Sequence, residues 1–73
     1  MITFECHYCD WSTLIPINDD NLLRLEKVVC EQCGKINWLY HSRLNPCTFS
    51  DEAVIVDEAH HAVTLRPGVE WPV

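Results

Sequence analysis

Apolar and polar residues alternate over short distances along much of the chain, which predicts short β-strands. Residues 2–6 (ITFEC) and 11–17 (WSTLIPI) are rich in β-branched and aromatic side chains, as strands are. The polar run 18–21 (NDDN) between apolar segments indicates a turn. Residues 35–43 (KINWLYHSR) form another expected strand. Its large apolar side chains fall on one face, because every second residue of a strand points the same way: Ile36, Trp38 and Tyr40.

The segment 22–30 (LLRLEKVVC) is compatible with two structures. Its apolar residues alternate as in a strand, whereas Asp19 or Asp20 could cap a short helix over residues 21–27. We expect a strand for at least Lys27–Cys30.

A similar choice arises near the C-terminus. Residues 53–57 (AVIVD) and 62–66 (AVTLR) are two β-rich runs separated by four residues, a spacing that suits a β-hairpin. The alternative is a helix with Ser50 as its N-cap. Three consecutive β-branched residues at 54–56 favour the hairpin, because such side chains lose rotamer freedom in a helix.

Length and charge narrow the class of protein. A chain of 73 residues forms one small domain and buries little apolar surface, so it needs additional stabilisation. The net charge of −6 disfavours non-specific binding to nucleic acid or to an anionic membrane. Residues 1–46 contain both cysteine pairs, and residues 47–73 form an acidic extension that we expect to pack on or beside the first part as one domain.

Two cysteine pairs supply the candidate stabilisation. Each has the form C-x2-C, and twenty residues separate them, a spacing typical of zinc sites. Two thiolates on one tight turn can both bind one ion, and two such turns complete a tetrahedron. No targeting segment is recognisable at the N-terminus, so we expect a cytoplasmic protein, in which paired cysteines hold metal more often than disulfides. The predicted ligands of one structural Zn²⁺ are Cys6, Cys9, Cys30 and Cys33.

The residue after each pair supports this interpretation. A knuckle often requires a left-handed backbone there, which Gly34 adopts freely and Asp10 tolerates. Over about residues 2–45 the chain resembles a zinc ribbon, in which two knuckles on β-hairpins clasp one ion. The resemblance implies a small, mostly β, metal-stabilised fold of two hairpins, here followed by an acidic β-rich extension. Four protein ligands leave no open position for catalysis, so we expect no enzyme.

The two cysteine pairs suggest three functions for this chain. The first is a regulatory or adaptor protein that binds a protein partner, with transcription machinery as an analogy from the breadth of the family. The layout also resembles the Com-type phage regulators, which bind messenger RNA, although the acidic charge opposes nucleic acid. Rubredoxins, which are iron-containing electron carriers, are a third comparison. They usually carry a glycine after both pairs, whereas Asp10 follows the first pair here.

Several other residues are candidates for contacts with a partner. Trp11, Trp38 and Tyr40 could stack on bases, but a ribbon this small needs large aromatic residues in its core. Cys47, His7 and the adjacent His60 and His61 are expected to be a spare thiol, a knuckle spacer and loop residues. The residues that we predict to contact a partner are Asp57, Glu58, Trp71, Trp38 and Arg43.

Residues 53–62 (AVIVDEAHHA) resemble the ATPase motif of superfamily 2 helicases. In such enzymes an Asp-Glu pair acts on a nucleotide-bound magnesium ion, and a Gly-rich loop holds the phosphates. The chain has two glycines, Gly34 and Gly68, and no G-x4-G-K-[ST] loop. The match is therefore interpreted as chance, and no nucleotide is expected to bind.

Overall fold

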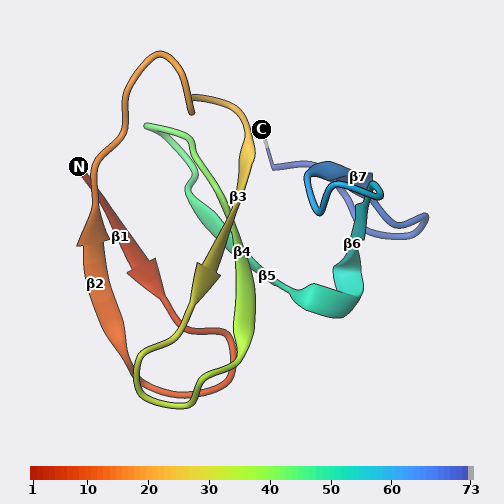
Figure 1. The fold of residues 1–73 in the computed structure, drawn as a ribbon. Helices are drawn as coiled ribbons and strands as arrows, with labels where there is room; N and C mark the ends of the chain where they lie inside the picture. The colour runs from red at the N-terminus through yellow and green to blue at the C-terminus, as the bar shows by residue number, and fades with distance from the viewer. Residues whose placement is uncertain (73) are drawn as a thin grey trace.

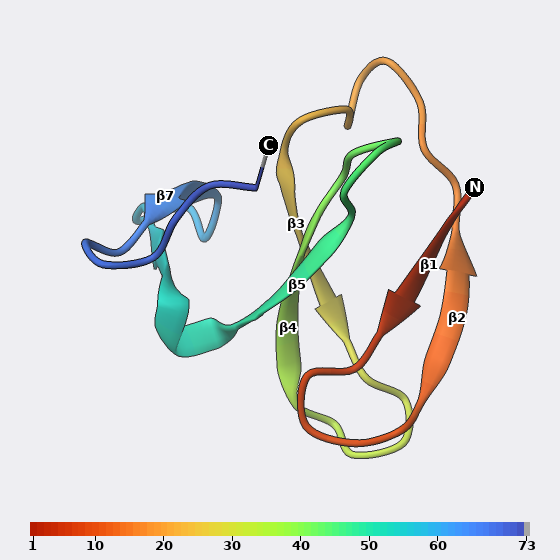
Figure 2. The same cartoon turned by 180° about the vertical axis from the view of Figure 1, so that it is seen from behind.

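In the computed structural model, which describes residues 1–72, seven short strands form three antiparallel sheets (Figures 1 and 2). β1 pairs with β2, β3–β4–β5 form a three-stranded sheet, and β6 pairs with β7. The strands are β1 (Ile2–Glu5), β2 (Ser12–Ile15), β3 (Leu25–Val29), β4 (Ile36–Tyr40), β5 (Cys47–Ser50), β6 (Val54–Val56) and β7 (Ala62–Leu65). The fold is thus small and mostly β, as predicted. No helix within residues 1–72 is long and apolar enough to cross a membrane.

The three-stranded sheet lies between the two hairpins. Each of its two faces packs against one hairpin through a separate apolar cluster. Leu39 and Val28 face the β1–β2 hairpin and pack with Phe4. Trp38 and Leu25 point to the opposite face and pack with the β6–β7 hairpin. Successive residues of a strand point to opposite faces, so β4 supplies both clusters. The molecule therefore has two small cores that share one sheet.

The cluster on the β1–β2 side supports the cysteine pairs. Phe4 and Leu39 are fully buried, and the ring of Phe4 meets that of Trp11 edge-on at 5.8 Å between centroids. Cys6 and Cys30 belong to the same cluster. Burial of these side chains contributes roughly 2 kcal/mol each, so the apolar cluster and the cysteines stabilise the same end of the molecule.

The cluster on the other side is organised around Trp38. This side chain is 3% exposed and packs with Val54 and Leu65 of the C-terminal hairpin. Its indole N–H donates a hydrogen bond of 2.7 Å to the Asp51 carboxylate. Trp38 thus joins the central sheet to the hairpin through both apolar packing and a charge-assisted hydrogen bond.

The C-terminal hairpin is confirmed. Val54 pairs with Leu65 and Ile55 with Thr64, and the register shifts between Ile55 and Val56. The helical alternative survives only as a single 3-10 turn at Asp51–Ala53 (η1), for which the Ser50 side chain makes no capping bond. Residues 47–50, assigned to the C-terminal part by the sequence, form β5 and pair with β4.

The turn predicted at residues 18–21 is present and continues further than expected. The Asn18 side chain accepts hydrogen bonds from the backbone N–H groups of Asp20 and Asn21, at 2.9 and 3.1 Å. Leu23 then adopts a left-handed backbone with φ of 61°. This conformation is incompatible with the alternative helix over residues 21–27, and β3 begins at Leu25.

Candidate metal centre

The two C-x2-C pairs lie in loops at the same end of the molecule (Figures 1 and 2). Cys6 directly follows β1 and Cys30 directly follows β3, so each pair begins where a strand ends. Antiparallel pairing fixes both loops: Cys6 N–H donates to the Trp11 carbonyl at 2.9 Å, and Cys30 N–H to the Lys35 carbonyl at 3.0 Å. The knuckles are therefore held by the ladders of two different sheets.

The four cysteine sulfurs form one cluster. Cys6 Sγ lies 3.7 Å from Cys33 Sγ, and Cys9 Sγ lies 3.5 Å from Cys30 Sγ. All four sulfurs lie within 4.8 Å of one another. A tetrahedral ion with bonds of about 2.3 Å to sulfur requires sulfur separations of about 3.8 Å. The cluster thus fits one four-coordinate metal ion, and the predicted ligand set is the one that the fold brings together.

Backbone N–H groups of the knuckles donate hydrogen bonds to the sulfurs of Cys6 and Cys30. Tyr8 N–H donates to Cys6 Sγ at 3.4 Å. In the second knuckle, the N–H groups of Gln32 and Cys33 donate to Cys30 Sγ at 3.3 and 3.4 Å. Such bonds favour a thiolate over a thiol, because they place partial positive charge next to the sulfur. The knuckle backbones therefore hold the sulfurs of Cys6 and Cys30 in a preformed arrangement.

The residues after the two pairs differ in conformation. Gly34 has φ of +74°, and its N–H donates to the Cys30 carbonyl at 2.9 Å. A left-handed backbone at this position was predicted and is confirmed. Asp10 is not among the residues with positive φ, so the same prediction for the first knuckle was wrong. The Cys6–Trp11 hydrogen bond closes that loop without a left-handed residue after the second cysteine.

The proton affinities of the cysteines differ because they compete within one cluster. Burial opposes ionisation of Cys6, but the N–H groups of Tyr8 and Cys9 and the neighbouring thiols lower its pKa to about 6. The Trp11 N–H favours the Cys9 thiolate, yet burial and the neighbouring sulfurs raise the pKa of Cys9 to about 12. The pKa of Cys33 is also raised. A dication held by the four cysteines would remove this competition, because it would favour all four thiolates at once.

Asn37 is a buried residue that connects the two knuckles. Its side chain is fully buried, and its Nδ2 donates to Cys6 Sγ at 3.6 Å and to the Lys35 carbonyl at 3.2 Å. Its Oδ1 accepts a hydrogen bond of 2.8 Å from His7 N–H. One amide group therefore orients a sulfur ligand and ties both loops together. Its position inside β4 gives no sequence signal for this role.

Replacing Asn37 with alanine should weaken metal binding about 10- to 100-fold, the usual cost of losing an outer-shell hydrogen bond to a ligand. Competition with a chromophoric zinc chelator measures this change. Gln32→Ala is the matched control, because Gln32 is exposed and its hydrogen bond to Cys30 uses only the backbone. Equal affinities of Asn37→Ala and the original chain would show that Asn37 does not orient Cys6.

The residues predicted to contact a partner differ in their exposure. Trp38 must be corrected, because it is buried and bonded to Asp51 and therefore belongs to the core. Trp71 is 46% exposed and meets Tyr40 edge-on at 5.7 Å between ring centroids. Arg43 is exposed, 3.9 Å from an Asp19 carboxylate oxygen.

Asp57 and Glu58, at the end of β6, are both exposed. One carboxylate oxygen of Asp57 accepts hydrogen bonds from the N–H groups of Ala59 and His61, at 3.0 and 2.8 Å. Asp57 therefore organises the β6–β7 loop, which also contains His60 with a left-handed φ of 64°. The Glu58 carboxylate takes no part in these loop hydrogen bonds.

The remaining histidines and Cys47 lie outside the four-cysteine group. His7 is exposed, and its ring meets the Tyr8 ring edge-on at 5.2 Å. His41 is fully buried, and its Nε2 bonds the Glu26 carboxylate. This pair of a buried histidine and an exposed glutamate was not predicted, because residues fifteen apart in sequence meet only through the β3–β4 register. Cys47 is a half-buried free thiol.

The fold and the site together define a small β protein with a zinc-ribbon-like arrangement and four cysteines positioned to hold one metal ion. Comparisons with protein-family models, with curated proteins and with solved structures find no match for this chain.

Proposed function

We propose that this chain is a non-enzymatic regulatory or adaptor module that binds another protein. The observation that carries the proposal is the closed cysteine cluster. All four coordination positions of a tetrahedral ion are met by cysteine sulfur, so no position remains for a substrate or a water molecule. A metal held in this way stabilises a surface and does not act on a substrate.

The proposed ion is Zn²⁺. Four sulfur ligands in a tetrahedron suit zinc or iron, and structural sites of four cysteines in knuckles are typical of zinc. Binding of such an ion to small peptides contributes on the order of 10 kcal/mol, which is comparable to the stability of a whole domain. Zinc would therefore hold the two knuckles, and with them two of the three sheets, in fixed positions.

The proposed partner is a protein, because charge opposes the alternatives. The chain contains eleven Asp and Glu residues and only five Lys and Arg residues. A phosphate backbone is repelled by such a chain, whereas a protein partner with a basic or mixed surface is attracted. By analogy with other zinc ribbons, the transcription machinery is the first class of partner to examine. The exposed carboxylate of Glu58 is the proposed contact on the acidic side.

Affinity capture with the tagged, zinc-loaded chain from a lysate of its own cells should recover a specific protein whose retention survives nuclease treatment. Glu58→Lys should reduce recovery several-fold, because a rim charge contributes to steering and pairing. Glu31→Lys is the matched control: it makes the same charge change at an exposed position in the second knuckle. Capture that disappears with nuclease, together with sub-micromolar binding of RNA at physiological salt, would favour an RNA-binding regulator instead.

A further inference from the structure

β3 is an edge strand whose outer side is unpaired among residues 1–72. Cys30 N–H donates to the Lys35 carbonyl, and His41 N–H donates to the Arg24 carbonyl. In this segment the backbone N–H and C=O groups of even-numbered residues therefore point toward β4. In an antiparallel pair the backbone groups of alternate residues point to opposite sides. The N–H and C=O groups of Leu25, Lys27 and Val29 therefore point away from β4. Edge groups of this kind are a template for another strand.

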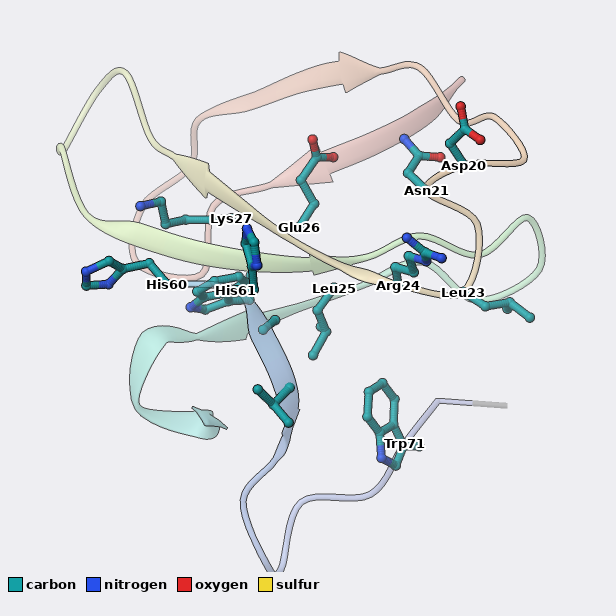
Figure 3. A pocket seen from close by; sticks show the side chains of 13 residues that line it. Asp20, Asn21, Leu23, Arg24, Leu25, Glu26, Lys27, His60, His61 and Trp71 are labelled. Atoms are coloured by element: carbon teal, nitrogen blue, oxygen red, sulfur yellow. The ribbon is translucent and has the colours of Figure 1, made fainter. Parts of the chain in front are cut away.

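An open cleft of about 730 Å³ lies beside this edge, between β3, β7 and the C-terminal tail (Figure 3). Leu25 lines it from the central sheet, and the buried Trp38 lies beneath it. Val63 and Trp71 line it from the other side and are 60% and 46% exposed. Large apolar side chains thus flank unpaired backbone groups, which is the combination that recognises an extended peptide.

The cleft is richer in basic residues than the chain as a whole. Arg24 and Lys27 line it together with His60 and His61, and its acidic lining residues are Asp20 and Glu26. Figure 3 shows Lys27 and the two histidines toward one end, and Arg24 toward the other. Glu26 also comes from β3, but its carboxylate points away from the cleft and bonds His41. Two of the five Lys and Arg residues of an acidic chain therefore gather at one unpaired edge.

We propose that this cleft binds an extended, acidic segment of the protein partner, which adds to β3 as a further strand. The proposal rests on the adaptor function above and specifies its binding surface. Aliphatic side chains of the segment would lie against Leu25, Val63 and Trp71, and carboxylates would lie near Lys27. A second copy of the chain is a poor occupant, because two molecules of net charge −6 repel each other.

The probe is a blocked peptide of about eight residues, long enough for one strand, that alternates valine or isoleucine with aspartate or glutamate. Added to the zinc-loaded chain, it should slow hydrogen exchange of the Leu25 and Lys27 amides by about tenfold or more. A peptide with lysine in place of the acidic residues should not. Two N-methylated versions of the acidic peptide can be compared, one methylated at odd-numbered and one at even-numbered residues. Binding should be abolished only in the version whose methylated N–H groups would point toward β3.

Lys27→Glu should weaken binding of the acidic peptide by at least about fivefold, because it replaces an attraction with a repulsion. Arg66→Glu makes the same charge change at an exposed residue that does not line the cleft, and it should leave affinity within about twofold. Equal binding of the acidic and basic peptides, protection confined to other amides, or self-association through β3 at the same concentrations would each overturn the proposal.

The two proposals can fail separately. If a captured protein partner is retained equally by Lys27→Glu and by the original chain, the cleft proposal fails while the adaptor function stands. If no protein is captured but the acidic peptide protects the β3 amides, the cleft binds as proposed and the adaptor function fails.

Discussion

Replacing Cys30 with serine will abolish cooperative folding of the chain in the presence of one equivalent of zinc. Cys30 is almost fully buried and its sulfur lies 3.5 Å from Cys9 Sγ, so the substitution removes one of four ligands and leaves a polar hydroxyl in an apolar cluster. Metal binding worth on the order of 10 kcal/mol cannot be replaced by the rest of so small a core. The dispersion of amide resonances and the loss of a cooperative thermal transition measure the effect.

Cys47→Ser is the matched control for this substitution. Cys47 has the same chemistry, is half-buried in β5 and lies outside the four-cysteine group. It should keep one zinc ion and change the free energy of unfolding by less than about 1 kcal/mol. A cooperative transition in Cys30→Ser that equals that of Cys47→Ser would mean that the metal centre does not hold the fold.

The second large effect is expected at Trp38, on the opposite face of the central sheet. Trp38→Ala should lower the free energy of unfolding of the zinc-loaded chain by about 3–5 kcal/mol, the range for deleting a buried aromatic side chain. Asp51 also loses the donor of its 2.7 Å hydrogen bond. Because this cluster contains Val54 and Leu65, amides of the β6–β7 hairpin should lose protection first. Urea unfolding and hydrogen exchange measure both changes.

Trp71→Ala serves as the comparison, because Trp71 is about half exposed and its ring meets that of Tyr40 edge-on. It should cost no more than about 1.5 kcal/mol, the usual value of an aromatic pair. The zinc ligands lie in the other cluster, so Trp38→Ala should still bind one ion. A loss in Trp38→Ala as small as in Trp71→Ala would show that the hairpin is held by other contacts.

The metal ligands could be predicted from the sequence because local spacing determines them. A C-x2-C pair closes within one turn whatever the rest of the chain does, and two pairs on separate hairpins suffice for a tetrahedral site. The strands at residues 2–5, 36–40 and 54–56 were also predictable, because β-branched and aromatic residues are concentrated there.

The roles of Asn37 and His41 could not be predicted, because they depend on how sheets pack. Whether a residue of β4 faces the knuckles or the C-terminal hairpin follows from having a layer on each side of the sheet. β4 is only five residues long, and the sequence of so short a strand does not indicate that both of its faces are covered. The left-handed backbone at Leu23 was missed for a related reason, since leucine carries no preference for it.

The proposed role of zinc is tested most directly by counting the metal and removing it. Native mass spectrometry of the chain, purified under reducing conditions with zinc and iron both available, should find one Zn²⁺ per molecule. Chelation should convert the dispersed spectrum of a folded β protein into that of an unfolded chain, and one equivalent of zinc should restore it. A chain that carries no metal, or that stays folded with four free thiols after chelation, would contradict the account.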